Sequence, residues 1–148
     1  MKIWNWITNV RIRVFHKDGT IEEVNKHNLI TDAGKQMLAG VFAGTVDGKI
    51  RYVAVGSSNV TPSATQTALG GEFFRKAVTT QTTSSTSVQT TMVLAPADAN
   101  AQIEEIGWFA GPDASNVSGS GIMIARILYS HLKNDLEQIQ IDRTDTVG

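Results

Sequence analysis

A regular alternation of apolar and charged residues constrains the fold more than any other feature of the sequence. It occurs in the stretch VRIRVFHKDGTIEEV, residues 10–24, where three apolar side chains alternate with two arginines from Val10 to Val14. A period of two is typical of a strand with one buried face. An Asp-Gly pair at residues 18–19 suits a tight turn, and an Ile-Glu-Glu-Val run then returns. The stretch therefore predicts a β-hairpin.

Short segments of similar character recur along the rest of the chain. They are rich in Val, Ile and Thr, which suit the pleated surface of a sheet. The expected strands are residues 50–56, 73–80, 84–94, 103–109, 122–130 and 136–143. The period of the fourth of these slips at the Glu104–Glu105 pair, which predicts a β-bulge. Residues 95–100 and 111–121 have the composition of loops.

One helix is predicted, within the segment NLITDAGKQMLAGVFAG at residues 28–44. Thr31 or Asp32 can cap it by accepting a hydrogen bond from an early backbone N–H. Apolar residues then follow at helical spacing, and Gly44 is suited to end the helix. Two internal glycines each cost about 1 kcal/mol relative to alanine, so we expect a short helix held by packing against strands.

Seven or eight short strands with one helix inserted early predict a mainly β fold. We expect an antiparallel β-sandwich or a jelly-roll-like barrel. A chain of 148 residues suits one domain with a substantial core. We expect residues 10–148 to form this single β-rich domain and residues 1–9 to form an N-terminal aromatic arm.

Composition argues against several kinds of function. With 13 basic and 14 acidic residues, the chain lacks the basic excess that general nucleic-acid binding requires. The absence of cysteine excludes disulfides, thiolate zinc sites and cysteine nucleophiles. No apolar run approaches the length of about 18 residues needed to span a bilayer, and no secretory signal is visible at the N-terminus. We expect a soluble protein made in a cytoplasm, with neither a membrane nor a nucleic acid as partner.

The stretch YVAVGSSNVTPSATQTALGGEFFR, residues 52–75, has some features of a ligand-binding glycine loop. It lacks the Gly-Lys-Ser/Thr sequence of a phosphate-binding loop, and no clear helix follows Gly56. We interpret the stretch as a structured connection between two strands. A single helical turn is expected at residues 67–69, a kink at the Gly-Gly pair that follows, and Leu69 is expected to enter the core.

Candidate catalytic and metal-binding residues form no recognisable pattern. The three histidines, His16, His27 and His131, are far apart in the sequence, so no metal site is predicted. The glutamate pairs at residues 22–23 and 104–105 consist of neighbours that point to opposite faces of a strand. We expect them on the surface or in ion pairs with Arg11 or Arg13. The sequence predicts no catalytic residue, no cofactor and no enzymatic activity.

The N-terminus, MKIWNWI, contains two of the three tryptophans of the protein. Chain ends are loose unless they are tied down, and tryptophan is favoured at the energetic centres of interfaces. This segment could pack on its own domain, dock on a neighbouring subunit or, as a weaker alternative, lie on a membrane surface. For the docking interpretation the candidate interface residues are Ile3, Trp4, Trp6 and Ile7.

Four motifs occur in a definite order between residues 28 and 130: NLITDAGKQMLAG, IRYVAVGSSNVTPSATQTALGGEFFRKAV, IEEIGWFAG and GSGIMIARILYS. This ordered set resembles structural proteins of tailed bacteriophages, namely small tail or baseplate proteins and the N-terminal attachment regions of tail fibres. The sequence contains no collagen-like repeat, heptads or receptor-binding tip. The resemblance therefore implies a free-standing adaptor, collar, tail or capsid-decorating subunit, and not a whole fibre.

The resemblance implies a virion location and a function carried by assembly. Its partners would be copies of itself, with a homotrimer expected from the systems that it resembles, and other virion proteins. A tail, baseplate or fibre-adaptor component is the expected role, and capsid decoration on the head is the alternative. Two further hypotheses stay open: a carbohydrate-binding module with Trp108 or Tyr129 as its aromatic platform, and a hydrolase whose distant acidic or histidine residues meet in a cleft.

Overall fold

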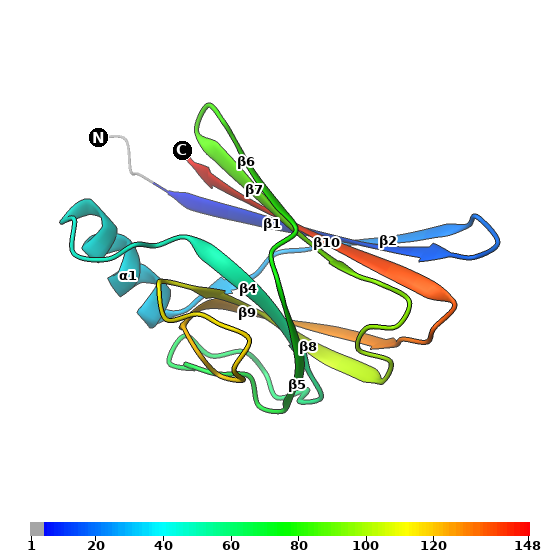
Figure 1. Cartoon of the computed structure of the whole chain (residues 1–148). Coiled ribbons are helices and arrows are strands. Elements are labelled where there is room, and N and C mark those ends of the chain that lie inside the picture. Colours follow the sequence, from blue (N-terminus) through cyan, green and yellow to red (C-terminus); the bar gives the residue numbers. More distant parts are fainter. Residues whose placement is uncertain (1–4) are drawn as a thin grey trace.

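Two antiparallel five-stranded sheets, stacked face to face, form the fold that the computed structural model describes for residues 5–148 (Figure 1). In spatial order, sheet A contains β2 (Ile21–Lys26), β1 (Trp6–His16), β10 (Glu137–Val147), β7 (Ser87–Leu94) and β6 (Thr80–Ser84). Sheet B contains β3 (Leu29–Ile30), β9 (Ile122–Leu132), β8 (Gln102–Ala110), β4 (Ile50–Gly56) and β5 (Glu72–Ala77). The helix α1 (Asp32–Phe42) connects β3 to β4. The predicted mainly β fold, a sandwich with one short inserted helix, is confirmed.

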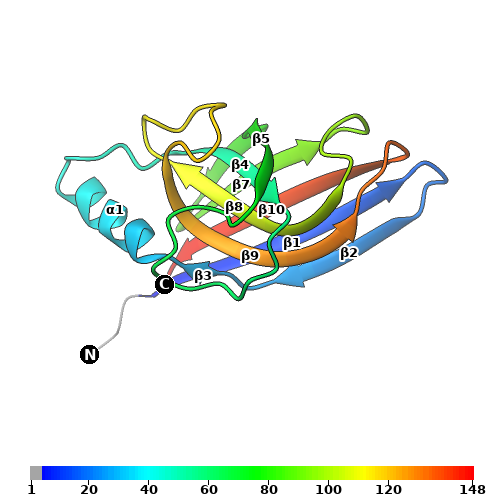
Figure 2. The same ribbon diagram turned by 90° about the horizontal axis from the view of Figure 1, so that it is seen from below.

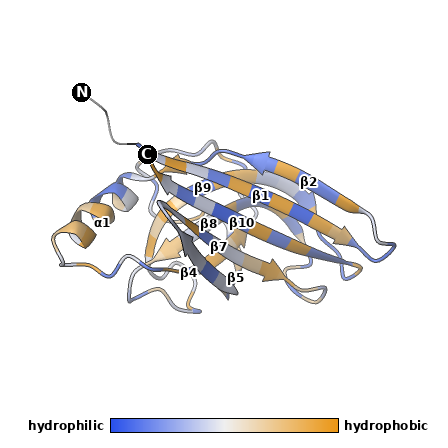
Figure 3. Cartoon of the chain, turned by 90° about the horizontal axis from the view of Figure 1, so that it is seen from above, coloured by the Kyte–Doolittle hydropathy of each residue, from blue (hydrophilic) through white to orange (hydrophobic). Residues whose placement is uncertain are grey.

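The core lies between the two sheets and is built from the inward-facing residues of each. In β1 the alternating Val10, Ile12 and Val14 are at most 2% exposed, as the sequence period predicts. Trp108 and Ile124 of sheet B belong to the same buried cluster. Full burial of one such aliphatic side chain contributes roughly 1.5–3 kcal/mol. The alternation of hydrophobic and hydrophilic residues is visible along β1 and β10 in Figure 3.

The predicted hairpin is formed by β1 and β2. Gly19 has a φ of +90°, which a residue without Cβ adopts at little cost. The Asp18 side chain accepts hydrogen bonds from the backbone N–H and the hydroxyl of Thr20 at 2.9 and 2.6 Å. The turn of this hairpin lies at the end of the sandwich opposite to α1, as Figures 1 and 2 show.

The helix begins with the predicted cap. Thr31 Oγ1 accepts a hydrogen bond from the Gly34 N–H at 3.0 Å and donates one to the Met123 carbonyl at 2.6 Å. A Cβ added at Gly34 would lie 2.9 Å from the carbonyl oxygen of Ile124, so this glycine permits α1 to approach β9 closely. The glycine that weakens the isolated helix therefore allows the packing that holds it.

Three local predictions differ from the structure. The strand expected from Val10 begins at Trp6, so residues 6–9 of the expected arm pair with β10 inside sheet A. Residues 80–94 form the hairpin β6–β7, whereas the sequence predicted separate strands at 73–80 and 84–94. The helical turn expected at residues 67–69 is wrong, since this part of the connection has no helical structure. The predicted β-bulge is confirmed, because the β8–β9 register shifts between Ile103 and Glu105.

Candidate assembly surface

The four predicted interface residues are divided between two parts of the chain. Ile3 and Trp4 lie outside the described residues. Trp6 begins β1, and its indole Nε1 donates a hydrogen bond to Asp145 Oδ1 at 2.8 Å. Ile7 follows on the same strand and is 54% exposed. Since β1 pairs with β10 from its first residue, Trp6 and Ile7 are part of the sandwich.

A buried ion pair holds the position of Trp6. The Arg143 guanidinium donates from Nε and Nη2 to the two carboxylate oxygens of Asp145 at 2.8 and 2.7 Å. The same guanidinium lies 5.2 Å from the centre of the Trp108 ring. Both charged residues continue the inward-facing row that Ile139 and Ile141 form in β10. A bidentate pair of this kind has a defined geometry, so Asp145 presents a fixed acceptor to the Trp6 indole.

An apolar cavity of about 640 Å³ opens next to Trp6, between α1 and the β6–β7 hairpin. Its apolar lining comes from the helix, from both sheets and from both ends of the described chain, and includes Trp6, Met37, Leu38, Val41, Val88 and Val147. A smaller cavity of about 400 Å³ shares Trp6 and Leu38 with it and reaches Asn5. The α1 end of the sandwich is therefore hollowed and mainly apolar.

Two residues of the cavity rim leave apolar surface in contact with solvent. Val41 in α1 is 38% exposed, and Val147 at the end of β10 is 44% exposed. Single exposed apolar residues are common on soluble proteins, but an apolar hollow with an exposed apolar rim is typical of a binding or contact site. We define the α1-end surface as the larger cavity together with this rim.

The glycine-rich connection between β4 and β5 is fastened by a charge of the protein itself. The carboxylate of Glu105 accepts hydrogen bonds from the backbone N–H groups of Ser58, Gly70 and Gly71 at 3.2, 3.0 and 2.7 Å. It also accepts one from Arg126 Nε at 2.7 Å. The amides of this loop therefore surround an internal carboxylate, and Glu105 occupies the position that the anion of a ligand would take in a phosphate-binding loop.

Arg126 binds the same connection from its other side. Its Nη1 donates to the Val60 carbonyl at 2.7 Å and its Nη2 to the Ser58 carbonyl at 3.1 Å. The side chains of Arg126 and Glu105 are 1% and 0% exposed. The expectation that Glu105 lies on the surface or pairs with Arg11 or Arg13 is wrong, because the connection covers it and Arg126 neutralises it. The predicted structured connection with Leu69 in the core is confirmed, since Leu69 is 8% exposed.

The motif residues that carry the phage resemblance meet in this region. Gly70, Glu105 and Arg126 come from three of the four motifs and form one hydrogen-bonded network. Beside them, Arg75 forms two hydrogen bonds with Glu72, both at 2.8 Å, and its guanidinium lies 4.3 Å from the centre of the Phe109 ring. In this chain these motif residues have structural roles, because they fasten the long connection to sheet B.

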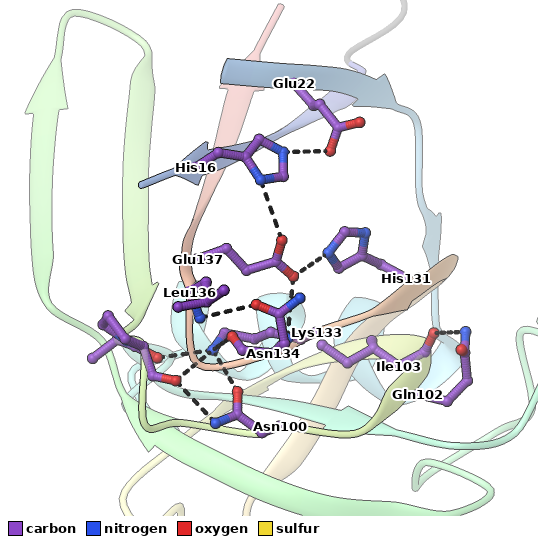
Figure 4. Close-up of polar contacts among 12 residues, drawn as sticks. His16, Glu22, Asn100, Gln102, Ile103, His131, Lys133, Asn134, Leu136 and Glu137 are labelled. Atoms are coloured by element: carbon purple, nitrogen blue, oxygen red, sulfur yellow. Dashed lines mark hydrogen bonds and ion pairs between the residues drawn. The ribbon is translucent and has the colours of Figure 1, made fainter. Parts of the chain in front are cut away.

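A second polar cluster, drawn in Figure 4, lies at the end of the sandwich opposite to α1. Glu137, 4% exposed, has one carboxylate oxygen 2.6 Å from His131 Nε2 and the other 3.5 Å from His16 Nδ1. The second ring nitrogen of His16 lies 3.0 Å from Glu22. His16 ends β1, and the sequence does not predict its proximity to His131. Nothing in the local sequence indicates it, since the two residues come from strands of different sheets.

This cluster includes a stacked ring and a buried lysine. The rings of Tyr129 and His131 stack with centres 5.8 Å apart. Burial raises the pKa of Tyr129 to about 12, and the charges of Glu22 and Glu137 act in the same direction. Lys133 Nζ donates to the carbonyls of Ala95 and Pro96 at 2.9 and 3.2 Å, and burial lowers the pKa of its ammonium group.

The described residues give little support to a metal site or to the expected carbohydrate-binding platform. Between residues 5 and 148, no group of three or more His, Asp or Glu side chains is placed to hold a metal ion. Trp108 and Tyr129, the candidate aromatic platform for a glycan, are 0% and 6% exposed. A sugar ring cannot stack on a buried ring, so these two residues do not form the expected platform.

The comparisons with known proteins indicate no function for this chain, so the function has to be inferred from the geometry. The chain matches no family model, no curated protein and no solved structure. For the part of the chain that the structure describes, no helix has the length and apolar character needed to cross a membrane. Within the described residues, the α1-end surface combines an apolar hollow with exposed apolar side chains.

Proposed function

We propose that this chain is a structural subunit of a tailed-bacteriophage particle and that it acts by assembly, as a tail, baseplate or fibre-adaptor component. The observation that carries the proposal is the α1-end surface, an apolar hollow with Trp6, Val41 and Val147 along its rim. The ordered motifs between residues 28 and 130 supply the link to phage proteins. Capsid decoration on the head is the alternative location.

The α1-end surface suits a protein contact because of its size and chemistry. A side chain as large as tryptophan buries about 150–250 Å² on docking, which corresponds to roughly 4–6 kcal/mol before the costs of association. The cavity volume of about 640 Å³ can accept such a side chain. Trp6 is held by its hydrogen bond to Asp145, so this part of the rim is organised before a partner arrives.

The partner we propose for this surface is the N-terminal segment of a neighbouring copy. Four residues precede Asn5, and three of them, Met1, Ile3 and Trp4, are apolar. Asn5, which follows this segment, lines the smaller cavity at the α1 end, so we propose that the copy that receives the segment abuts the same end.

A double substitution, Ile3→Ser with Trp4→Ser, tests the role of the segment. It keeps Trp6, its bond to Asp145 and the β1–β10 pairing, so the fold should be retained. We expect a smaller oligomer by sedimentation and at least a tenfold loss of incorporation into particles. Val117→Ser, which changes a 63% exposed valine in the loop between β8 and β9, is the matched control. Unchanged mass and incorporation in the double variant would contradict an exchange of segments between copies.

Location within the particle requires a separate experiment. Binding of the purified protein to isolated tails and to empty heads should favour tails if the chain is a tail, baseplate or adaptor component. Preference for heads would instead support the decoration alternative. Absence of the chain from purified particles, together with catalytic turnover of a small molecule, would contradict the assembly function as a whole.

A further inference from the structure

The free edge of sheet A is formed by β2, and this strand is unusually open. Of its six residues, Ile21–Asn25 are all exposed, and only Lys26 is half-buried. Strand β1 is its neighbour on one side, and no described strand lies on the other. Figure 3, a view onto sheet A, shows β2 along the margin of the sheet. Edge strands of this kind present unpaired backbone groups to other chains.

The hydrogen-bond pattern of β1 determines which groups of β2 face outward. Asn5 exchanges two backbone hydrogen bonds with Gly148 of the β10 side, and the His16 N–H donates to the Thr20 carbonyl on the β2 side. Bonding direction alternates along an antiparallel strand, so odd residues of β1 bond β10 and even residues bond β2. Through the β1–β2 register, the even residues of β2 bond β1. The N–H and C=O groups of Ile21, Glu23 and Asn25 therefore point out of the sheet.

This alternation restricts how two copies of β2 can pair. In an antiparallel ladder, residues that exchange hydrogen bonds must both have their groups directed at the partner. An odd residue of one copy therefore has to face an odd residue of the other. Across a two-fold axis, two registers pair five of the six residues of β2, and they place Glu23 or Val24 opposite its own copy.

Charge decides between these two registers. Centring on Glu23 puts two carboxylates opposite each other, and like charges directly opposite are destabilising. Centring on Glu22 or Asn25 pairs only three residues of the strand, because β2 runs from Ile21 to Lys26. Centring on Val24 places Val24 against Val24, Glu23 against Asn25, and Glu22 against Lys26 of the other copy. The last arrangement forms two opposite-charge pairs and buries two valines that are 38% exposed in the single chain.

We propose that two copies of this chain associate through their β2 edges, antiparallel and centred on Val24, to form a continuous ten-stranded sheet. Four backbone hydrogen bonds, between Glu23 and Asn25 of each copy, join the two strands. Glu22 bonds His16 through Oε2 and lies on the same face as Lys26, so its charge is presented where the partner lysine arrives. The inference does not rest on the virion role, because it concerns the isolated chain.

The opposite edge of sheet A lacks these features. Strand β6 has the sequence TQTTS, which contains no charged residue and no apolar side chain. Its composition therefore favours no register for self-pairing, whereas β2 has a charge pattern that is complementary to itself about Val24. This contrast is the reason for assigning the contact to β2.

Disulfide cross-linking of single cysteine variants tests the register directly, because the chain contains no other cysteine. In the proposed pairing the two Val24 Cα atoms face each other at about 4.5 Å, within the range that a disulfide requires. The corresponding atoms of Glu23 or Asn25 lie roughly 9 Å from their own copies, which is too far. Under mild oxidation we expect Val24→Cys to give a covalent dimer at least tenfold faster than Glu23→Cys and Asn25→Cys.

Sedimentation of the unmodified chain over roughly 10 µM to 1 mM provides the second measurement. Glu23→Pro removes an outward N–H and leaves the bonds to β1 in place, so it should raise the dissociation constant at least tenfold without unfolding the protein. Glu22→Lys and Lys26→Glu should each weaken the dimer, and their combination should restore it. Restoration by the double variant would not occur if the single changes merely damaged the fold.

Three results would overturn the proposal. One is a concentration-independent monomer with equally slow cross-linking at all three cysteine positions. A second is fastest cross-linking through Glu23→Cys or Asn25→Cys, which would indicate another register. A third is a charge-swapped double variant that dimerises no better than the two single variants. These outcomes are separate from failure of the N-terminal segment test, which changes residues at the other end of the sandwich.

Discussion

Two glutamates are buried in this sandwich, and they have different partners. Glu105 in β8 contacts the guanidinium of Arg126 and three loop amides. Glu137 at the start of β10 contacts the imidazoles of His131 and His16. Their side chains are 0% and 4% exposed, so burial alone does not distinguish them.

The difference between them lies in whether the partner can lose its charge. An arginine stays protonated in proteins, whereas a histidine changes its charge over the physiological pH range. Removal of Glu105 would leave a buried cation with no way to become neutral. Removal of Glu137 would leave two imidazole rings, which carry no obligatory charge. The comparison teaches that a fixed buried charge requires the Glu105 carboxylate, whereas the partners of Glu137 do not impose this requirement.

The largest effect is expected at Glu105. Glu105→Gln keeps the shape of the side chain but leaves Arg126 without its counter-charge, so the free energy of unfolding should fall by about 3–5 kcal/mol. Urea denaturation measures this loss. The adjacent Glu104→Gln is the control and should change stability by less than about 0.5 kcal/mol, because Glu104 is bonded at the surface to Gln102 and Ser130. Equal losses in the two variants would contradict a special role for Glu105.

A smaller loss is expected when the space around the Glu105 carboxylate is filled. A Cβ at Gly56 would clash with Glu105 Oε1 and would lie 2.8 Å from the Gly71 carbonyl oxygen. Gly56→Ala should therefore cost about 1–3 kcal/mol by displacing the connection. Gly119→Ala is the comparison, since nothing lies within 4 Å of a Cβ there and only its φ of +77° is unfavourable. If the two variants lose the same stability, close packing around Glu105 is not the cause.

The Glu137 region should respond to alkali. The pKa of Tyr129 in the folded protein is raised to about 12, above its ordinary value of 10.0, so the folded state resists ionisation. This contribution is fully present below pH 10 and is lost as the pH rises toward 12. We expect the free energy of unfolding to fall by about 1–2 kcal/mol between pH 9 and 11. In Tyr129→Phe this part of the decrease should disappear, and an identical pH profile in both proteins would argue against the assignment.

The smallest effect is expected for Glu137→Gln. Its partners are imidazoles, which carry no obligatory charge, so we expect a loss of only about 1 kcal/mol in urea denaturation. The same variant removes a negative charge that raises the pKa of Tyr129, so that pKa should decrease in a spectroscopic titration. Glu22→Gln, at a side chain 63% exposed, should change stability by less than about 0.5 kcal/mol. A loss as large as that of Glu105→Gln would remove the distinction between the two regions.

Much of the local structure could be predicted from the sequence because its signals are local. Strand β4 has the predicted bounds, the Asp-Gly turn joins β1 to β2, and Thr31 caps α1. In each case the determining residues lie within a few positions of the feature. The sequence does not predict the β6–β7 turn because the local signal is absent there. Ser85 adopts a φ of +51° without the glycine or asparagine that usually indicates such a turn.

The candidate sites depend on contacts that the sequence does not record. Glu105 faces Leu128 across the β8–β9 pair and Gly107 faces Arg126, so Glu105 and Arg126 are diagonal neighbours only in this register. His16 and His131 meet at Glu137 because His16 faces Glu137 in the β1–β10 pair and β9 of the other sheet leads directly into β10. The α1-end surface likewise requires the helix, the β6–β7 hairpin and the start of β1 to come together.

By itself, the sequence determined the strand periods, the helix cap, the mainly β class and the absence of cysteine chemistry. These properties follow from side-chain alternation and backbone preferences, which act over a few residues. Only the tertiary structure decided which charges are buried and which apolar residues remain exposed. The environment of a charge depends on the segment that covers it, and in this chain that segment lies tens of residues away.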